Sequence, residues 1–427
     1  MKKQHITALA AFAAGAMVLA GCAPSGPAAD EQAGDEVTLT VWSWQAQMTN
    51  DWERVFDIYE ESHPGVTVQF EGYAPTEYNQ ILATGLEGTG GPDVAMLRSY
   101  GGLQNLIVAD QLVPITDEID GLDQIDATVL QGATGKEDGE IYGVPFATQT
   151  LQMLYNKTMF DDMGLEEPTT WKEFIRLQDD LVEAGVTPMA LAAREDWVLP
   201  IFTDIIGSAH YGGSEFEAQV LSGEKDFLAP EFVGALDAVS EMRQYLDPNV
   251  MAIGSADATI QFTSGQAAQW PGGSYDLKNF EDTAPDTEFG VYQVPVSPDS
   301  VLDRPVTPAY ADGSFGINAA SENQEASLEL LQWMTTPEYG QAIADEIGQF
   351  SALPDVTYSN PLMQEMQDLY NEGPAPYLLL VNFRYGDPSG TVVLGTNIQK
   401  MFLGESTPEQ VATALQTGIS AWFTPGE

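Results

Sequence analysis

The chain has very little cysteine, histidine and positive charge. Its 427 residues include one cysteine, three histidines and 15 lysines and arginines against 64 acidic residues, for a formal net charge of −49. A single cysteine excludes an internal disulfide, and three histidines without ligand spacing or a Cys-x-x-Cys pair argue against a zinc site. So acidic a surface repels phosphate backbones and anionic headgroups, which excludes nucleic acid as a partner and leaves membrane contact only through an anchor.

Motifs for covalent and phosphate chemistry are also missing. There is no Gly-x-Ser-x-Gly elbow, and the glycines of 88–91 run into Pro-Asp where a phosphate-binding loop would have Gly-Lys-Ser/Thr. We therefore expect no catalytic residues, no metal and no cofactor. One enzymatic alternative stays open, because a secreted glycosidase needs only two carboxylates about 5–10 Å apart and this chain has many acids.

The N-terminus has the pattern of a processing signal. A basic start, Met1–His5, precedes an apolar run over 6–20 that is short for a membrane span, and Leu-Ala-Gly-Cys22 follows. This ending resembles the bacterial lipoprotein cleavage box, which implies a signal peptide over 1–21 and a lipid on Cys22 that anchors the protein outside the cell. A plain secretory signal with a stray cysteine is the alternative. Loss of Lys2 and Lys3 would change the net charge to −49 − 2 = −51.

The mature chain begins with a Pro-, Gly- and Ser-rich stretch over 22–36, which we interpret as a flexible tether. Strands are then predicted at 37–42, 66–70 and 94–97, with a helix from a capping box at Asn50–Glu53 to about 62 and another over 77–86. Alternation of strands and helices indicates an α/β fold with a largely parallel sheet. Ligands bind beyond the carboxyl ends of such strands.

The stretch 140–157 organises the middle of the chain. Tyr142–Phe146 and Leu151–Tyr155 are extended runs separated by the polar pair Gln149 and Thr150. We interpret the stretch as a strand that crosses between two lobes with the polar pair facing a cleft; a strand, a polar bend and a second strand inside one domain is an equal alternative. Unpaired buried amides cost roughly 1–3 kcal/mol, so the pair needs partners in either case.

Further along, the sequence predicts a helix over 171–184 capped by Thr170 with Glu173 at N3, and strands over 188–192, 265–270 and 314–318. Residues 271–275 are expected to form a Gly-rich turn. The extended run 289–295, which ends in proline, is a candidate second crossing.

Several segments in this order resemble the carbohydrate branch of the extracellular solute-binding proteins of ABC importers, the group that contains maltose-binding protein. The matching segments are 37–42, His63–Val68, Gly90–Val94, Tyr142–Pro145, Leu154–Lys157, Pro168–Phe174, Phe262–Ala268, Gly316–Ser321 and Trp333–Glu338. The resemblance implies two α/β lobes, the first from 37–147 and 296–335 and the second from 148–295 and 336–427, with crossings at 142–155 and 291–296. It also implies a ligand held between lobes that close by hinge bending, and delivery to a membrane permease by a monomer.

A sugar presents hydroxyls at its edge and C–H faces, so it needs planar polar groups and aromatic rings. By position in the family, the resemblance implies these ligand contacts: Trp44, Gln45, Arg98, Tyr100, Gln149, Glu195, Asp196, Trp197, Trp270, Gly272, Tyr275, Tyr310, Asp312 and Arg384. Trp270 as a buried strand residue and Arg98 in a structural ion pair are the alternatives. A mono- or oligosaccharide is the expected ligand; a polyol, an anionic sugar or glycerol phosphate is the alternative, and an anion would need Arg98, Arg194 or Arg384 grouped in the cleft.

Overall fold

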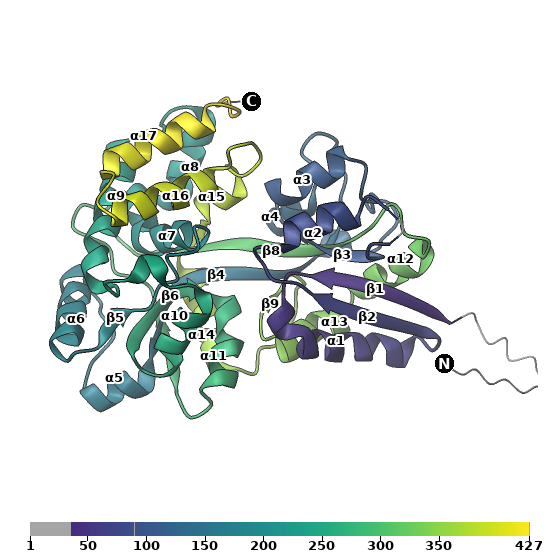
Figure 1. Cartoon of the computed structure of the whole chain (residues 1–427), viewed down its shortest axis with the longest axis horizontal. Helices are drawn as coiled ribbons and strands as arrows, with labels where there is room; N and C mark the ends of the chain where they lie inside the picture. The colour runs from purple at the N-terminus through teal and green to yellow at the C-terminus, as the bar shows by residue number, and fades with distance from the viewer. Residues whose placement is uncertain (1–35, 89, 427) are drawn as a thin grey trace, which may run out of the picture.

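A computed structural model describes residues 36–88 and 90–426, so the predicted signal peptide, the tether and Cys22 lie outside the described residues. Helices gather on both sides of a long mixed sheet into two lobes (Figure 1). The strand order is β2 (Val66–Gly72), β1 (Val37–Ser43), β3 (Val94–Arg98), β8 (Thr307–Ile317), β4 (Val144–Asn156), β6 (Ala267–Gly273) and β5 (Thr187–Met189). Strand β10 (Pro374–Pro376) lies beside β8, and β7 (Phe289–Tyr292) and β9 (Phe350–Ser351) lie beside β4. The parallel strands predicted for the first lobe are present, since β1 pairs in parallel with both β2 and β3.

The first lobe is built mainly from the beginning of the chain. Its elements are β1 (Val37–Ser43), α1 (Thr49–Ser62), β2 (Val66–Gly72), α2 (Tyr78–Gly85), β3 (Val94–Arg98), α3 (Gly101–Val108), α4 (Ala127–Leu130), α12 (Gln324–Trp333), α13 (Pro337–Ala342) and the π-helical turn η7 (Ile343–Ile347). Helix α1 begins one residue before the predicted start and has no side-chain cap. The predicted capping box at Asn50–Glu53 is therefore wrong, because Asn50 is already inside the helix.

The second lobe holds most of the remaining helices. Its elements are α5 (Lys157–Met163), α6 (Trp171–Glu183), β5 (Thr187–Met189), α7 (Val198–Tyr211), α8 (Gly213–Ser222), α9 (Pro230–Met242), α10 (Ser255–Thr263), β6 (Ala267–Gly273), α11 (Leu277–Thr283), β7 (Phe289–Tyr292), α14 (Pro361–Glu372), β10 (Pro374–Pro376), α15 (Leu378–Val381), α16 (Gly390–Phe402) and α17 (Pro408–Ile419). The predicted capping box of Thr170 and Glu173 is confirmed at α6. The predicted turn at 271–275 is wrong for its first half, because Pro271–Gly273 pair with β4 as part of β6.

Strand β4 (Val144–Asn156) runs unbroken through the polar pair and belongs to both lobes. Val144 and Phe146 pack in the first hydrophobic core, whereas Leu151 and Met153 pack in the second. Between them, Gln149 and Thr150 stay in register with β8. The prediction that this stretch crosses between the lobes is confirmed, whereas the prediction that Gln149 and Thr150 face a cleft is wrong, because both side chains are buried.

The second crossing is β8 (Thr307–Ile317), not the predicted 291–296. Val291 and Val294 pack in the second core, while Phe315 and Ile317 of β8 pack in the first. Residues 296–306 stay with the second lobe, since the Leu302 N–H donates to the carbonyl of Ala209 in α7 at 3.1 Å. The predicted start of the first lobe's second segment at 296 is therefore too early.

A third connection follows α13. Tyr339, Ile343 and Ile347 lie in the first core, and the short strand β9 (Phe350–Ser351) then pairs with β4 near Ala147. The predicted boundary at 335 thus precedes the real change of core, because α13 and η7 bury their apolar side chains against the first lobe. Across the described residues, no helix is both long and apolar enough to span a bilayer.

Candidate functional site

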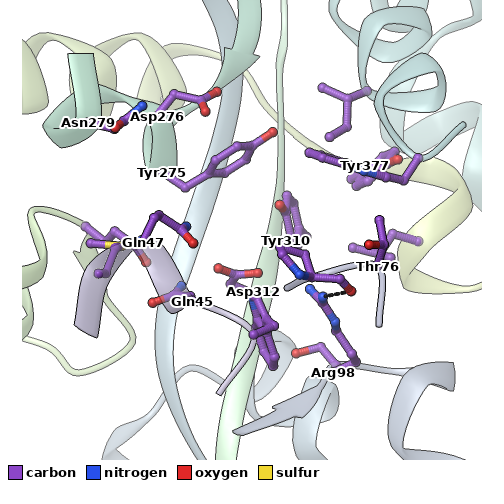
Figure 2. Close-up of a pocket in the computed structure, with 18 of the residues that line it drawn as sticks. Gln45, Gln47, Thr76, Arg98, Tyr275, Asp276, Asn279, Tyr310, Asp312 and Tyr377 are labelled. Atoms are coloured by element: carbon purple, nitrogen blue, oxygen red, sulfur yellow. Dashed lines mark hydrogen bonds between the residues drawn. The ribbon is translucent and has the colours of Figure 1, made fainter. Parts of the chain in front are cut away.

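A cavity of about 580 Å³ lies where the two cores meet. Nine of the residues predicted from the sequence line it: Trp44, Gln45, Arg98, Asp196, Trp197, Tyr275, Tyr310, Asp312 and Arg384. Figure 2 shows several of these side chains converging on the cavity from both lobes. Five predicted residues, Tyr100, Gln149, Glu195, Trp270 and Gly272, do not line it, and each of the five has a structural role instead.

The first lobe contributes its side chains from the carboxyl ends of β1 and β3. Trp44 directly follows β1 and lies edge-on to Tyr78, with ring centroids 5.8 Å apart. The Arg98 guanidinium lies over the Trp44 ring, with Cζ 4.0 Å from the ring centroid. Burial, followed by the nearby charge of Arg384, lowers the pKa of Arg98 to about 10. The sheet-edge rule that selected Trp44 and Arg98 therefore placed them correctly.

Gln149 lies behind the residues that form the cavity floor and holds them by hydrogen bonds. Its amide Nε2 donates to Asp312 Oδ2 at 3.0 Å and to Gln349 Oε1 at 2.9 Å, and its Oε1 accepts from Ser274 Oγ at 2.7 Å. Its side chain is fully buried and does not reach the cavity. The polar pair that interrupts β4 is thus satisfied by protein groups, and Gln149 positions lining residues where the sequence predicted a direct contact.

Trp270 and Gly272 support the second lobe's wall. The indole N–H of Trp270 donates to Asp276 Oδ2 at 2.7 Å, while the ring packs edge-on against Phe280. Gly272 must lack a Cβ, since one would lie 2.1 Å from Trp270 Nε1. Asp276 itself lines the cavity, and burial raises its pKa to about 7.

Glu195 and Trp197 form a pair at the start of α7. The Glu195 carboxylate accepts from the Ser255 N–H at 2.9 Å and from the Ser255 hydroxyl at 2.7 Å, so it is directed away from the cavity. Its Oε2 also accepts the indole N–H of Trp197 at 3.0 Å. The Trp197 ring remains 42 % exposed and lines the cavity. Glu195 therefore orients the ring, which is exposed toward the cavity.

Tyr100 lies just before α3 in an uncommon backbone conformation, with φ of 59°. Its buried hydroxyl accepts the backbone N–H of Ala311 in β8 at 2.9 Å. The side chain thereby joins β3 to the second crossing and does not reach the cavity. The prediction of a ligand contact at Tyr100 is wrong because this tertiary hydrogen bond turns the ring inward.

The segment around α15 supplies a wall that the sequence only partly indicated. Tyr377 lies edge-on to Tyr310, with centroids 5.4 Å apart, and its N–H donates to Ala309 at 2.9 Å. Buried Asp204 accepts the Leu378 N–H at 3.0 Å and fixes this segment to α7. Arg384 follows and lines the cavity.

Further lining residues were missed by the sequence analysis. They are Gln47, Met48, Asp51, Pro75, Thr76, Asn79, Ser99, Ile201, Asp276, Lys278, Asn279, Asp282, Gln349, Tyr377, Leu380, Thr391 and Val392. Many lie on helices, where periodicity shows which face is polar but not which face meets the other lobe. Lys278 Nζ lies 3.9 Å from Asp51 Oδ1, an ion pair that joins the two lobes beside the cavity.

The chemistry of this wall suits recognition. Rings of Trp44, Trp197, Tyr275, Tyr310 and Tyr377 stand beside amides, carboxylates and two guanidinium groups. In residues 36–88 and 90–426, no group of three or more His, Cys, Asp or Glu side chains is arranged to hold a metal. Fold and cavity together define a two-lobed receptor for a small polar molecule.

The chain matches the family of bacterial extracellular solute-binding proteins over residues 43–341 and belongs to that family. A multiple sugar-binding protein of Streptococcus mutans is 25 % identical over 220 residues, which are 50 % of this chain and 51 % of that protein. A mannitol-binding protein of Pseudomonas aeruginosa is 24 % identical over 328 residues, or 72 % of this chain and 71 % of that one. The match therefore spans about half the length of the first relative and 71 % of the second.

Solved structures share the architecture. A bacterial solute receptor described as having an exclusive preference for β-D-galactopyranose has a TM-score of 0.78 and 19 % identity, covering 91 % of this chain and 100 % of its own. A chitin oligosaccharide binding protein has a TM-score of 0.75 and 22 % identity, covering 91 % and 99 %. At such identities the likeness establishes the two-lobed fold, and what those proteins bind is a property of their own sites.

Proposed function

We propose that this protein captures a mono- or oligosaccharide outside the cell and delivers it to the permease of an ABC importer. The observation that carries the proposal is the cavity between the lobes, where aromatic rings and planar polar groups stand together. Rings cover the C–H faces of a sugar, amides donate to and accept from the hydroxyls at its edge, and carboxylates accept from them. The sugar-binding descriptions of relatives agree with this chemistry.

The remaining parts of the proposal concern the protein's place in the cell. Membership of an extracellular family favours an extracytoplasmic location, and the signal ending in Cys22 favours a lipid anchor on that residue. The lipid anchor would keep a monomeric receptor at the membrane, near its permease. Two measurements on whole cells, protease accessibility and release into the medium, test this arrangement when the wild type is compared with Cys22→Ala. Protection of the wild type from protease would contradict the extracytoplasmic location, and release of both forms into the medium would contradict the anchor.

Two alternatives follow from specific observations. The mannitol-binding relative favours a polyol, which offers the same hydroxyls without a rigid ring. Asp276 and Asp312 in one cavity favour a glycosidase as the second alternative, whereas membership of the family favours capture without cleavage.

A thermal-shift screen over neutral sugars, acidic sugars and polyols separates these ligands, since a ligand at 100 times its Kd adds about 2.7 kcal/mol of stability. Product analysis after long incubation then separates a receptor from an enzyme. Unchanged oligosaccharide supports the proposal, and stoichiometric or greater cleavage contradicts it. Failure of every saccharide and polyol to shift the unfolding temperature would also contradict it.

A further inference from the structure

Two arginines enter the same cavity without an ion-pair partner. Arg98 ends β3 and Arg384 follows α15, and both line the cavity. Among the described residues, ion pairs within 4.0 Å involve Arg54, Lys157, Arg176, Arg194, Lys225 and Lys278, but neither of these two. With 64 acidic residues against 15 basic ones, the missing partners do not reflect any shortage of carboxylates.

Gly102 at the start of α3 lies beside the base of the Arg98 side chain and the guanidinium end of Arg384. A Cβ at Gly102 would lie 2.4 Å from Arg98 Cβ and 4.0 Å from Arg384 Cζ. Burial lowers the pKa of both guanidinium groups, yet their side chains keep some exposure because they border the cavity. Two enclosed like charges destabilise a protein unless an opposite charge joins them, and the open side from which one can come is the cavity.

Their hydrogen-bonding capacity is largely unused. Arg98 stacks on Trp44 and donates one long bond, 3.4 Å, to the Pro75 carbonyl. Within the described chain, no hydrogen bond is made by the Arg384 side chain, and burial lowers its pKa although Tyr377 and Tyr310 act to raise it. A stacked guanidinium leaves its edge free, and that planar edge matches a carboxylate.

The charge around the two arginines is positive on balance. Asp312, which Gln149 also binds, is the carboxylate that acts on Arg98, so the two guanidinium groups exceed it by one charge. The other charged lining residues are Asp51 and Asp282, which both pair with Lys278, and Asp196 and Asp276. Asp276 and Asn279 lie on the opposite side of the cavity from Arg98 (Figure 2). One side thus suits an anion, and the other suits hydroxyl groups.

We infer that the captured saccharide carries a carboxylate, as a uronic acid does, and that Arg98 and Arg384 bind that carboxylate while its hydroxyls face Asp276 and Asn279. The inference rests on the proposed function and narrows its ligand. The acidic net charge of the protein opposes the approach of an anion, so the paired guanidinium groups must supply the local attraction.

The test is calorimetric titration with matched saccharides: galacturonate against galactose, glucuronate against glucose, and an aldobiouronic acid against its carboxyl-reduced disaccharide. We expect the acidic member of at least one pair to bind ten times more tightly or better, and the methyl ester of that acid to lose this advantage. Equal or tighter binding of every neutral member overturns the inference but leaves sugar capture intact. Inorganic phosphate that displaces the acid more effectively than free acetate would overturn the carboxylate assignment.

Variants identify the residues. Arg384→Gln should remove the preference for the acid, Arg384→Lys should retain part of it, and Arg98→Gln should repeat the loss if Arg384→Gln fails to fold. Arg176→Gln, on the exposed face of α6 and outside the cavity, removes the same charge and should keep the preference. Retention of the preference in both Arg384→Gln and Arg98→Gln overturns the inference, whereas no binding of any saccharide by the wild type overturns the proposed function itself.

Discussion

Gln149 donates its side-chain amide to Asp312 at 3.0 Å, which fixes a carboxylate of β8 from the neighbouring strand β4. The same amide group also binds Gln349 and Ser274, so three segments far apart in sequence meet at one buried side chain. Asp312 and Gln349 line the cavity, and Ser274 immediately precedes Tyr275. The geometry of the cavity floor therefore depends on a residue that does not itself line the cavity.

Gln149→Ala should lower both stability and affinity. Each buried partner left without its hydrogen bond costs about 1–3 kcal/mol, and a displaced Asp312 should weaken ligand binding about tenfold. Chemical denaturation and calorimetry measure the two effects. Gln152→Ala is the matched control, because Gln152 is about as buried in β4 but bonds to Thr150 and Met366, neither of which lines the cavity. Equal affinity in the two variants would contradict the positioning role of Gln149.

Trp197→Ala should weaken binding by roughly 1–3 kcal/mol through loss of ring contact, as for aromatic anchors in other interfaces. The ring is 42 % exposed, so the loss of folding stability should be small. Trp171→Ala removes the same ring from α6, away from the cavity, and should leave affinity unchanged. Calorimetry on both variants measures the difference in affinity. An unaltered Kd in Trp197→Ala would show that Trp197 does not contact the ligand.

Gly101→Ala should hold the lobes apart. Gly101 begins α3 in the first lobe, and its Cβ would lie 2.1 Å from the backbone oxygen of Arg384 in the second. Alanine is otherwise favourable in a helix, so any loss of function should come from the clash between the lobes. We expect at least a tenfold loss of affinity, and a larger radius of gyration in small-angle scattering when ligand is present. Gly88→Ala, where the Cβ meets open space, serves as the control. Unchanged scattering and affinity would show that the backbone near Arg384 shifts to accommodate the added methyl group without separating the lobes.

Asp276 should make stability depend on pH. Burial raises its folded pKa from 3.8 to about 7, so the folded state binds more protons than the unfolded state between these values. Stability from this group is therefore greatest below about pH 4 and falls as the pH rises to 7. Denaturant midpoints at pH 4.5 and 7.5 should differ less in Asp276→Asn than in the wild type, whereas the exposed-site control Asp303→Asn should keep the wild-type difference. Burial also raises the pKa of Asp204 to about 7, and this residue should add the same pH dependence of stability in all three proteins.

Local sequence predicted the parts of the fold that local physics determines. The alternation in 37–42 and 66–70 predicted β1 and β2, and Thr170 with Glu173 predicted the start of α6. The rule that ligands lie beyond the carboxyl ends of strands then placed Trp44 and Arg98 at the cavity.

Long-range pairing decided the rest. The second crossing was predicted at 291–296 and not at β8, because β8 pairs with β3 and β4, which lie more than 150 residues earlier in the chain. Trp270 and Glu195 were placed at the cavity, but hydrogen bonds to Asp276 and Ser255 turn them into its support. Tyr377 and Gln349 reach the cavity from segments whose local patterns carry no sign of it.

The most direct test of the account is a crystal structure of the protein with the saccharide that gives the largest thermal shift. We predict one ligand between the lobes, in contact with Trp44 and Trp197 and within hydrogen-bond distance of Asp312. A ligand bound elsewhere on the surface, with this cavity holding only solvent, would contradict the claim that the protein captures its solute there.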